Sequence, residues 1–193
     1  MKQMLGYGQV KLAITGVSPL IVHNGQLCDP MNKIVKSLKQ VTSKRKKVDA
    51  DLEEMARLEF LGSLYLKDSK PVIPGEVMEA CLVSGAKKSK SGVQAKAGMF
   101  IEETIPIIYD GPKDPIELWN DERFRIVAGV KVGQARVMRT RPKFNDWRLE
   151  FTVSYLEELL NPKDVFEFAK VAGIQCGLCD WRPRFGRFVA EMM

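Results

Sequence analysis

Apolar and polar residues alternate with a period of two in several short segments of the chain, which predicts half-buried β-strands. The segments with this pattern are 9–17, 130–138, 147–155 and 185–191. The alternation is clearest in 147–155, where large apolar side chains and polar side chains take turns along the whole segment. We therefore expect four strands that form a sheet with one apolar face.

A helical period predicts the main helices, and their ends carry capping residues. One helix begins at Pro74 and has Gly85 near its end. Another begins at Asn161, and Gly173 closes it. A further helix is expected over 49–60, between a basic stretch without a clear period and a small hairpin.

These elements follow one another in the order strand, helix, strand, strand, helix, strand. This βαββαβ order is typical of an α+β protein with a ferredoxin-like (RRM-like) core, in which two helices cover one face of a four-stranded antiparallel sheet and leave the other face free. We expect a single domain over 1–193 with two insertions. Residues 24–70 would hold a basic loop, a helix and a hairpin, and 87–127 would hold a flexible basic loop and an irregular stretch. Residues 139–145 would form the turn between the central strands.

The composition is that of a globular domain. The chain has 193 residues, of which 45% are hydrophobic and 28% charged. No apolar run reaches the roughly 18 residues of a membrane span. Residues 1–8 lack the pattern of a signal peptide, and four Cys are too few for a disulfide scaffold. We therefore expect a cytoplasmic protein with no membrane partner.

Positive charge is concentrated in four segments that contain almost no acids. The chain has 30 Lys+Arg against 24 Asp+Glu, a net charge of +6. Residues 36–47 and 87–96 contain no acid, 136–148 contains only Asp146, and a fourth basic run lies in 182–187. Such acid-poor basic segments are typical of a surface that binds a polyanion such as nucleic acid.

The segment 173–188 combines arginines with aromatic residues. Three arginines alternate with Trp181, Phe185 and Phe188. Guanidinium groups pair with phosphates and aromatic faces stack on bases, so this mixture favours contact with a single strand. The alternative is that the aromatic residues pack in the core.

The same segment resembles a motif of the RAMP superfamily of CRISPR proteins. Its Gly-rich turn followed by Asp180-Trp-Arg-Pro-Arg-Phe-Gly-Arg-Phe188, between a helix and a terminal strand, is similar to the backbone-subunit branch and to small RAMP-like proteins of phages and other mobile elements. The resemblance extends over roughly 8–22 and 62–190. It implies a ferredoxin-like core that binds RNA along its backbone, in subunits that stack along a guide RNA.

We therefore expect a non-enzymatic protein that binds single-stranded nucleic acid, RNA rather than DNA, mainly through phosphate contacts and stacking. Further copies of the chain or CRISPR effector subunits would be its protein partners. The expected binding residues are most of the lysines and arginines of the four segments and one aromatic residue: Lys44, Arg45, Lys46, Lys47, Lys87, Lys88, Lys90, Lys96, Arg136, Arg139, Arg141, Lys143, Trp181, Arg182, Arg184 and Arg187.

Two other functions stay open. A phage-encoded decoy of a CRISPR backbone subunit would present the same surfaces to a host effector complex. An endoribonuclease would use His23, the only histidine, as general acid or base.

Cys176 and Cys179 have the C-x-x-C spacing of a zinc half-site or a redox pair. No second pair accompanies them in the sequence. We therefore expect two small thiols in a tight turn, with no metal and no cofactor.

Overall fold

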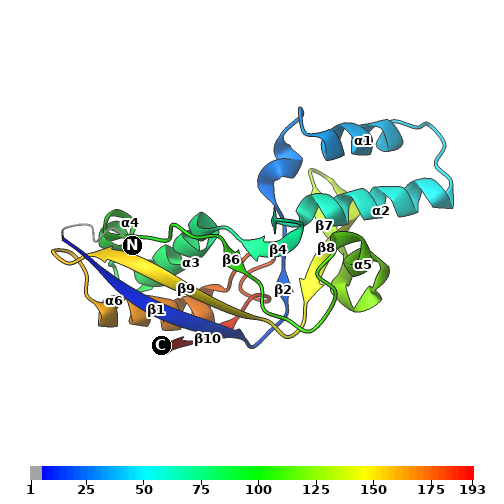
Figure 1. Cartoon of the computed structure of the whole chain (residues 1–193). Coiled ribbons are helices and arrows are strands. Elements are labelled where there is room, and N and C mark those ends of the chain that lie inside the picture. Colours follow the sequence, from blue (N-terminus) through cyan, green and yellow to red (C-terminus); the bar gives the residue numbers. More distant parts are fainter. Residues whose placement is uncertain (1–5) are drawn as a thin grey trace. The chain divides into compact units, whose positions relative to one another are not determined.

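Antiparallel sheets and helices make up residues 6–193, the part of the chain that the computed structural model describes (Figure 1). The α+β class is therefore confirmed. The chain separates into two units, each built from segments that are distant in the sequence. Unit 1 comprises Met1–Leu20, Val72–Asp110 and Asn145–Met193, and unit 2 comprises Ile21–Pro71 and Gly111–Phe144. Unit 2 thus contains the whole of the predicted insertion 24–70.

The sheet of unit 1 has the strand order β10-β1-β9-β5, and all three strand pairs are antiparallel. The predicted strands at 9–17 and 147–155 are confirmed, and the last strand begins at Phe188 rather than at Phe185. The four strands are β1 (Tyr7–Gly16), β5 (Met99–Phe100), β9 (Arg148–Leu156) and β10 (Phe188–Met192).

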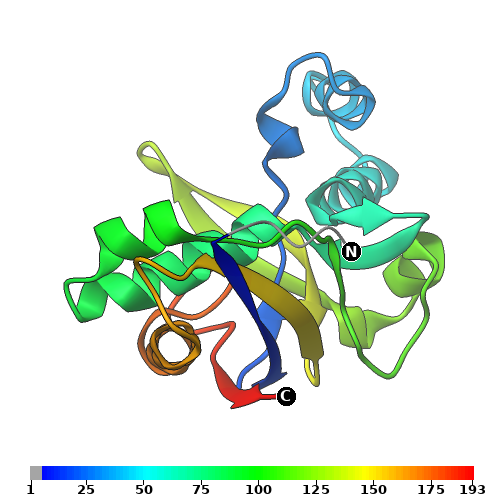
Figure 2. The same ribbon diagram turned by 60° about the vertical axis from the view of Figure 1, so that its left-hand side comes forward.

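Helices α3 (Gly75–Lys88) and α6 (Pro162–Val171) pack against each other and against this sheet, α3 on β5 and α6 on β1 and β10. Helix α4 (Gly92–Gly98) follows α3, and the π-helical turn η3 (Ala172–Cys176) continues α6. Figure 2 shows these helices on one side of β1 and β9. Accordingly, the side chains that face these helices are buried in both long strands, and burial extends to the other face at Ala13 and Ser154.

Close helix packing in unit 1 depends on glycine. A Cβ atom on Gly85 of α3 would collide with the carbonyl oxygen of Phe168 in α6. The prediction that Gly173 closes α6 is wrong, because helical structure continues to Cys176 and ends at Gly177, which has a φ of +76°. Gly173 instead allows close contact with Phe188 of β10.

Unit 2 contains a three-stranded sheet with the order β2-β8-β7. Helix α2 contacts β8, and α1 and α5 contact α2. The strands are β2 (Leu20–Ile21), which crosses the unit boundary, β7 (Arg125–Val132) and β8 (Ala135–Phe144). The helical elements are η1 (Gly25–Cys28), α1 (Lys33–Thr42), α2 (Asp49–Ser63), α5 (Pro115–Asn120) and η2 (Glu122–Phe124).

The predicted small hairpin is present in unit 2 as β3 (Leu66–Lys67) paired with the start of β4 (Lys70–Ile73). The unit boundary crosses β4. Within unit 1, the end of β4 pairs with β6 (Ile105–Pro106).

The predicted strand at 130–138 and the predicted turn at 139–145 are wrong. The chain turns back at Gly133, which has a φ of +60°, so β7 and β8 form a hairpin within unit 2. β8 then continues to Phe144. The period-two pattern runs through both strands, and the turn between them carries only a single glycine as a signal.

The predicted loops at 24–47 and 87–98 are also wrong in part. Asn32 caps α1, whose apolar residues face α2 although its other face is basic. The second loop contains the end of α3 and all of α4. Among residues 6–193, no helix has both the length and the apolar character needed to cross a bilayer.

Candidate nucleic-acid interface

The predicted binding residues are divided equally between the two units. Unit 1 contains the bases of 87–96 and the basic and aromatic residues of 181–187, whereas unit 2 contains those of 44–47 and 136–143. Each set therefore has to be judged on the surface of its own unit.

The basic and aromatic residues of unit 1 lie on a closed loop, Leu178–Arg187, which we call the arginine loop. The backbone N–H of Leu178 donates to the carbonyl of Gly186 (2.9 Å), and that of Gly186 donates to the carbonyl of Pro19 (2.8 Å). Gly186 has a φ of +70°, and a Cβ atom there would collide with the carbonyl of Leu178. These bonds close the loop and fix it to the segment that follows β1.

The arginine loop presents its cations to solvent. Arg182 and Arg184 are exposed, and neither forms an ion pair with any described residue. The rings of Trp181 and Phe185 are half-buried, with centroids 6.1 Å apart, and the guanidinium of Arg184 lies 5.8 Å from the Phe185 ring. Arg187 is also exposed, and its Nε donates to the carbonyl of Pro183 (2.7 Å). Cations and aromatic rings thus occur together on this loop.

The lysines of 87–96 surround a hollow where α3 passes into α4. This lysine hollow has a volume of about 730 Å³ and no acidic residue in its lining. Val93 lies in it with 85% of its surface exposed. Lys88 is exposed but does not line the hollow. The lining residues are Lys87, Lys90, Gly92, Val93, Lys96 and Ala97.

Helix α3 connects the arginine loop with the lysine hollow. The thiol of Cys81 in α3 donates to the carbonyl of Gly177 at the base of the loop (3.4 Å). The positive charge of Arg182 on the loop partly offsets the rise in the pKa of that thiol. Lys87 follows Cys81 by six residues, about 9 Å along a helix at 1.5 Å per residue. Both cationic groups are therefore held by the same helix of unit 1.

The thiols beside the arginine loop are not poised for chemistry. Burial raises the pKa of Cys81 to about 12, and burial also raises the pKa of Cys179. Both therefore stay protonated at neutral pH, whereas nucleophilic and metal-bound cysteines are thiolates. The described residues contain no group of His, Cys, Asp and Glu that could hold a metal ion.

In unit 2, the basic run 44–47 joins α1 to α2. Arg45, Lys46 and Lys47 are exposed, and Lys44 pairs with Asp51 (2.5 Å). The lysines on the outer face of α1 extend this basic surface. They are not among the predicted binding residues, because the helix that aligns them was not predicted. Their spacing of three is the signal that could have found them: Lys33, Lys36 and Lys39.

Two of the predicted arginines of unit 2 have structural roles. Arg139 forms an ion pair through Nη1 with the buried carboxylate of Glu59, which also accepts a hydrogen bond from the backbone N–H of Thr140 (3.0 Å). Arg141 is only 7% exposed, and its Nη1 donates to the carbonyl of Thr140 (3.2 Å). Arg136 is exposed near the hairpin turn, and Lys143 is half-buried.

The polar face of the sheet of unit 1 carries both signs of charge. Arg148 of β9 contacts Glu150 (3.1 Å) and Glu191 of β10 (3.5 Å), and the rings of Tyr7 and Phe100 lie 5.5 Å apart. The expected basic residues do not lie on this face. The predicted binding cations of unit 1 lie instead on the arginine loop and around the end of α3 and α4.

His23 lies in unit 2, half-buried after β2, and its carbonyl accepts a hydrogen bond from Tyr65 (3.4 Å). A catalytic role of its imidazole stays a prediction.

No protein-family model matches the chain, and no curated protein matches it. The resemblance to RAMP proteins therefore stays a prediction from the sequence motif.

Proposed function

We propose that the chain binds single-stranded nucleic acid, RNA in preference to DNA, through unit 1, and that it is not an enzyme. The observation that carries this proposal is the arginine loop, where unpaired exposed guanidinium groups lie beside the rings of Trp181 and Phe185. A cytoplasmic location belongs to the same proposal, as do further copies of the chain or CRISPR effector subunits as protein partners.

The chemistry of the loop suits a single strand. Arginine makes paired hydrogen bonds to phosphate oxygens, and aromatic faces stack on unpaired bases at about 1–3 kcal/mol per base. The lysine hollow adds positive charge at the end of α3, the helix that contacts the base of the arginine loop. Its exposed Val93 supplies an apolar surface for a sugar or base. Phosphate contacts would fix the strand, and stacking would tolerate any sequence.

We also propose that unit 1 is a ferredoxin-like core of the RAMP type. Its elements would be β1, α3, β5, β9, α6 and β10, so that β5 takes the place of the strand expected at 130–138. The strand order β10-β1-β9-β5 and the antiparallel pairing support this proposal, as does the packing of α3 and α6 on one face. The bound nucleic acid would follow the arginine loop and the ends of α3 and α4 rather than the sheet, because the polar face of the sheet carries acidic residues beside its basic ones.

A salt titration tests the proposal. If the three arginines of the loop and the three lysines of the hollow contact phosphates, log K should fall with log salt at a slope of about −4, at roughly −0.7 per contact. Filter binding of a labelled oligonucleotide at several salt concentrations gives this slope. A slope near zero would overturn the proposal.

Matched RNA and DNA oligonucleotides of the same sequence, in competition, test the preference for RNA, since only RNA offers the 2′-hydroxyl. Stronger competition by the RNA is the expected result. Equal competition would contradict the preference.

A further inference from the structure

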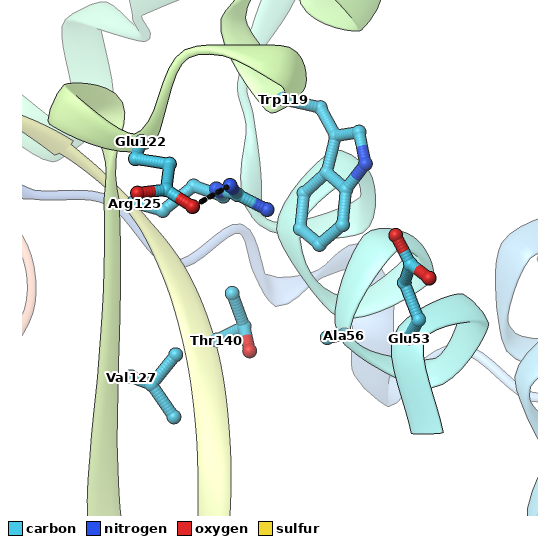
Figure 3. Close-up of a pocket in the computed structure, with 7 residues that line it drawn as sticks. All are labelled: Glu53, Ala56, Trp119, Glu122, Arg125, Val127 and Thr140. Carbon is cyan, nitrogen blue, oxygen red and sulfur yellow. Dashed lines mark hydrogen bonds and ion pairs between the residues drawn. The ribbon is translucent and has the colours of Figure 1, made fainter. Parts of the chain in front are cut away.

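A pocket of about 380 Å³ in unit 2 has walls of opposite charge (Figure 3). Its volume is in the range of small-ligand sites. It contains none of the residues proposed to bind a strand. Helices α2 and α5, the turn η2 and the strands β7 and β8 supply its lining: Glu53, Ala56, Trp119, Glu122, Arg125, Val127 and Thr140.

Arg125 forms the positive wall. Its guanidinium lies 4.5 Å from the centroid of the Trp119 ring, and Trp119 packs in turn on Phe60, with ring centroids 5.5 Å apart. Its Nη2 contacts Glu122 at 3.3 Å, but the Glu122 side chain is 90% exposed. Exposed ion pairs of this kind are weak. The guanidinium is thus held in place by the indole, while its carboxylate partner can be displaced by acceptors of a ligand.

Glu53 forms the negative wall. Figure 3 shows its carboxylate and the guanidinium of Arg125 on opposite sides of the indole of Trp119. Glu53 is exposed and has no ion-pair partner among residues 6–193. Its two oxygens are therefore available to donors of a ligand.

Thr140 supplies a polar group at the bottom of the pocket. Only 4% of the residue is exposed, yet its hydroxyl has no hydrogen-bond partner in the part of the chain that the structure describes. The hydroxyl itself is not fully shielded from solvent, so it is free to donate to or accept from a ligand in the pocket. Val127 and Ala56 provide apolar surface beside it.

We propose that this pocket binds a guanine base. Guanine presents two adjacent donors, N1–H and the N2 amino group, which match the two oxygens of Glu53. It presents two adjacent acceptors, O6 and N7, which match the fork of Arg125. The Thr140 hydroxyl can donate to or accept from the base. Adenine has one exocyclic amino group and no adjacent pair of donors for the carboxylate, so it fits less well.

The base could come from a free guanine nucleotide or from a guanine within a strand. This inference is independent of strand binding by unit 1, because binding of a mononucleotide can be measured with no strand present.

Calorimetric titration of the full chain with GMP and AMP tests the pocket. We expect GMP to bind at least about tenfold more tightly than AMP. Glu53→Gln and Thr140→Val should each weaken GMP binding, Glu53→Gln by about 5- to 150-fold, the range for loss of a paired base contact. Glu117→Gln makes the same charge change on an exposed residue of unit 2 outside the lining, and it should bind GMP like the wild type.

Equal binding of GMP and AMP, or wild-type binding of GMP by Glu53→Gln, would overturn the inference. Thr140→Val keeps the test valid if the other variant fails to fold, since it nearly preserves the shape of the side chain. Urea unfolding midpoints close to the wild-type value would show that each variant is folded.

Oligonucleotides of equal length with and without guanine distinguish the two sources of the base. A preference for the guanine-containing strand that disappears in Glu53→Gln supports a base within a strand. Equal binding of both strands, together with GMP binding, supports a free nucleotide. If neither a preference for the guanine-containing strand nor binding of GMP is observed, the pocket does not bind guanine. Strand binding by unit 1 is then still tested separately by the salt titration.

Discussion

The arginines of this chain differ in function because of the residues that contact them. Arg139 and Arg184 both belong to basic segments that contain almost no acids. Only the fold brings the buried carboxylate of Glu59 to Arg139, across eighty positions of sequence, while Arg184 is left beside an aromatic ring. The clustering of lysines and arginines in the sequence predicted that some of them bind an anion. It could not show which of them already have a carboxylate partner in the folded protein.

Gly186 sets the shape of the arginine loop, and its replacement tests how much the loop depends on it. Gly186→Ala should lower the free energy of unfolding by about 1–3 kcal/mol, because alanine disfavours its positive φ and the new Cβ meets the carbonyl of Leu178. Urea unfolding measures the change. Gly25→Ala is the control, since a Cβ there meets nothing within 4 Å. Equal stability of the two variants would contradict the geometry of the loop.

The buried thiols of unit 1 predict a loss of stability at high pH. Because burial raises the pKa of Cys81 from 9.0 to about 12 and raises that of Cys179, the folded state keeps protons that the unfolded chain has lost. The contribution is fully present below about pH 9 and is lost as the pH rises toward 12. The free energy of unfolding should therefore fall over this window, by up to about 1.4 kcal/mol per pH unit for each thiol.

Urea unfolding at several pH values measures this dependence. Cys81→Ala should reduce the slope above pH 9, whereas Cys28→Ala, at an exposed position, should leave it unchanged. An unchanged slope in Cys81→Ala would count against a shifted pKa at this thiol.

At the scale of elements, caps and periodicity predicted the regular parts of the fold. The alternation in β9 and the Asn161 cap of α6 identified two core elements of unit 1, because local chemistry and burial agree there. The helix α1 was missed although it is amphipathic, with Val35, Leu38 and Val41 at helical spacing, because its many lysines were interpreted as the mark of a basic loop. The seven-residue α4 was missed because so short a helix has little periodicity of its own.

The lysine hollow gives a prediction that belongs to α3 and α4 together. The triple variant Lys87→Ala, Lys90→Ala, Lys96→Ala should reduce the magnitude of the salt slope by about 2, at roughly 0.7 per lost phosphate contact. Filter binding measures it, with unrelated sequences affected alike. A triple variant of exposed lysines elsewhere controls for the change in net charge: Lys67→Ala, Lys70→Ala, Lys163→Ala. If both triple variants lower the slope equally, the hollow has no special role.

At the scale of the whole molecule, two units are interleaved along one chain. Unit 2 is assembled from Ile21–Pro71 and Gly111–Phe144, with a segment of unit 1 between them. The hydrophobic pattern could not reveal this division, because the strands of both units have the same period. It could not reveal the pocket of unit 2 either, since its lining comes from residues as distant as Glu53 and Thr140.

Because strand binding is proposed for unit 1, the exposed basic run 44–47 of unit 2 should contribute nothing to it. The variant Arg45→Ser, Lys46→Ser, Lys47→Ser should keep a salt slope of about −4, since six contacts of unit 1 at roughly −0.7 each account for that value. Filter binding measures the slope, with the triple variant of the lysine hollow as the positive control. A slope reduced in magnitude by about 2 would show that unit 2 also contacts nucleic acid.

The pairing of β1 with β10 has a consequence for the order in which the protein is made. Residues of unit 2 are all synthesised once Phe144 has been added, but Leu12 of β1 has no partner in β10 until Met192 exists. At about 5–20 residues per second, the ribosome needs roughly 2–10 s for that interval. During this time the nascent chain carries an incomplete sheet edge, which is the state in which a chaperone would be most useful to it.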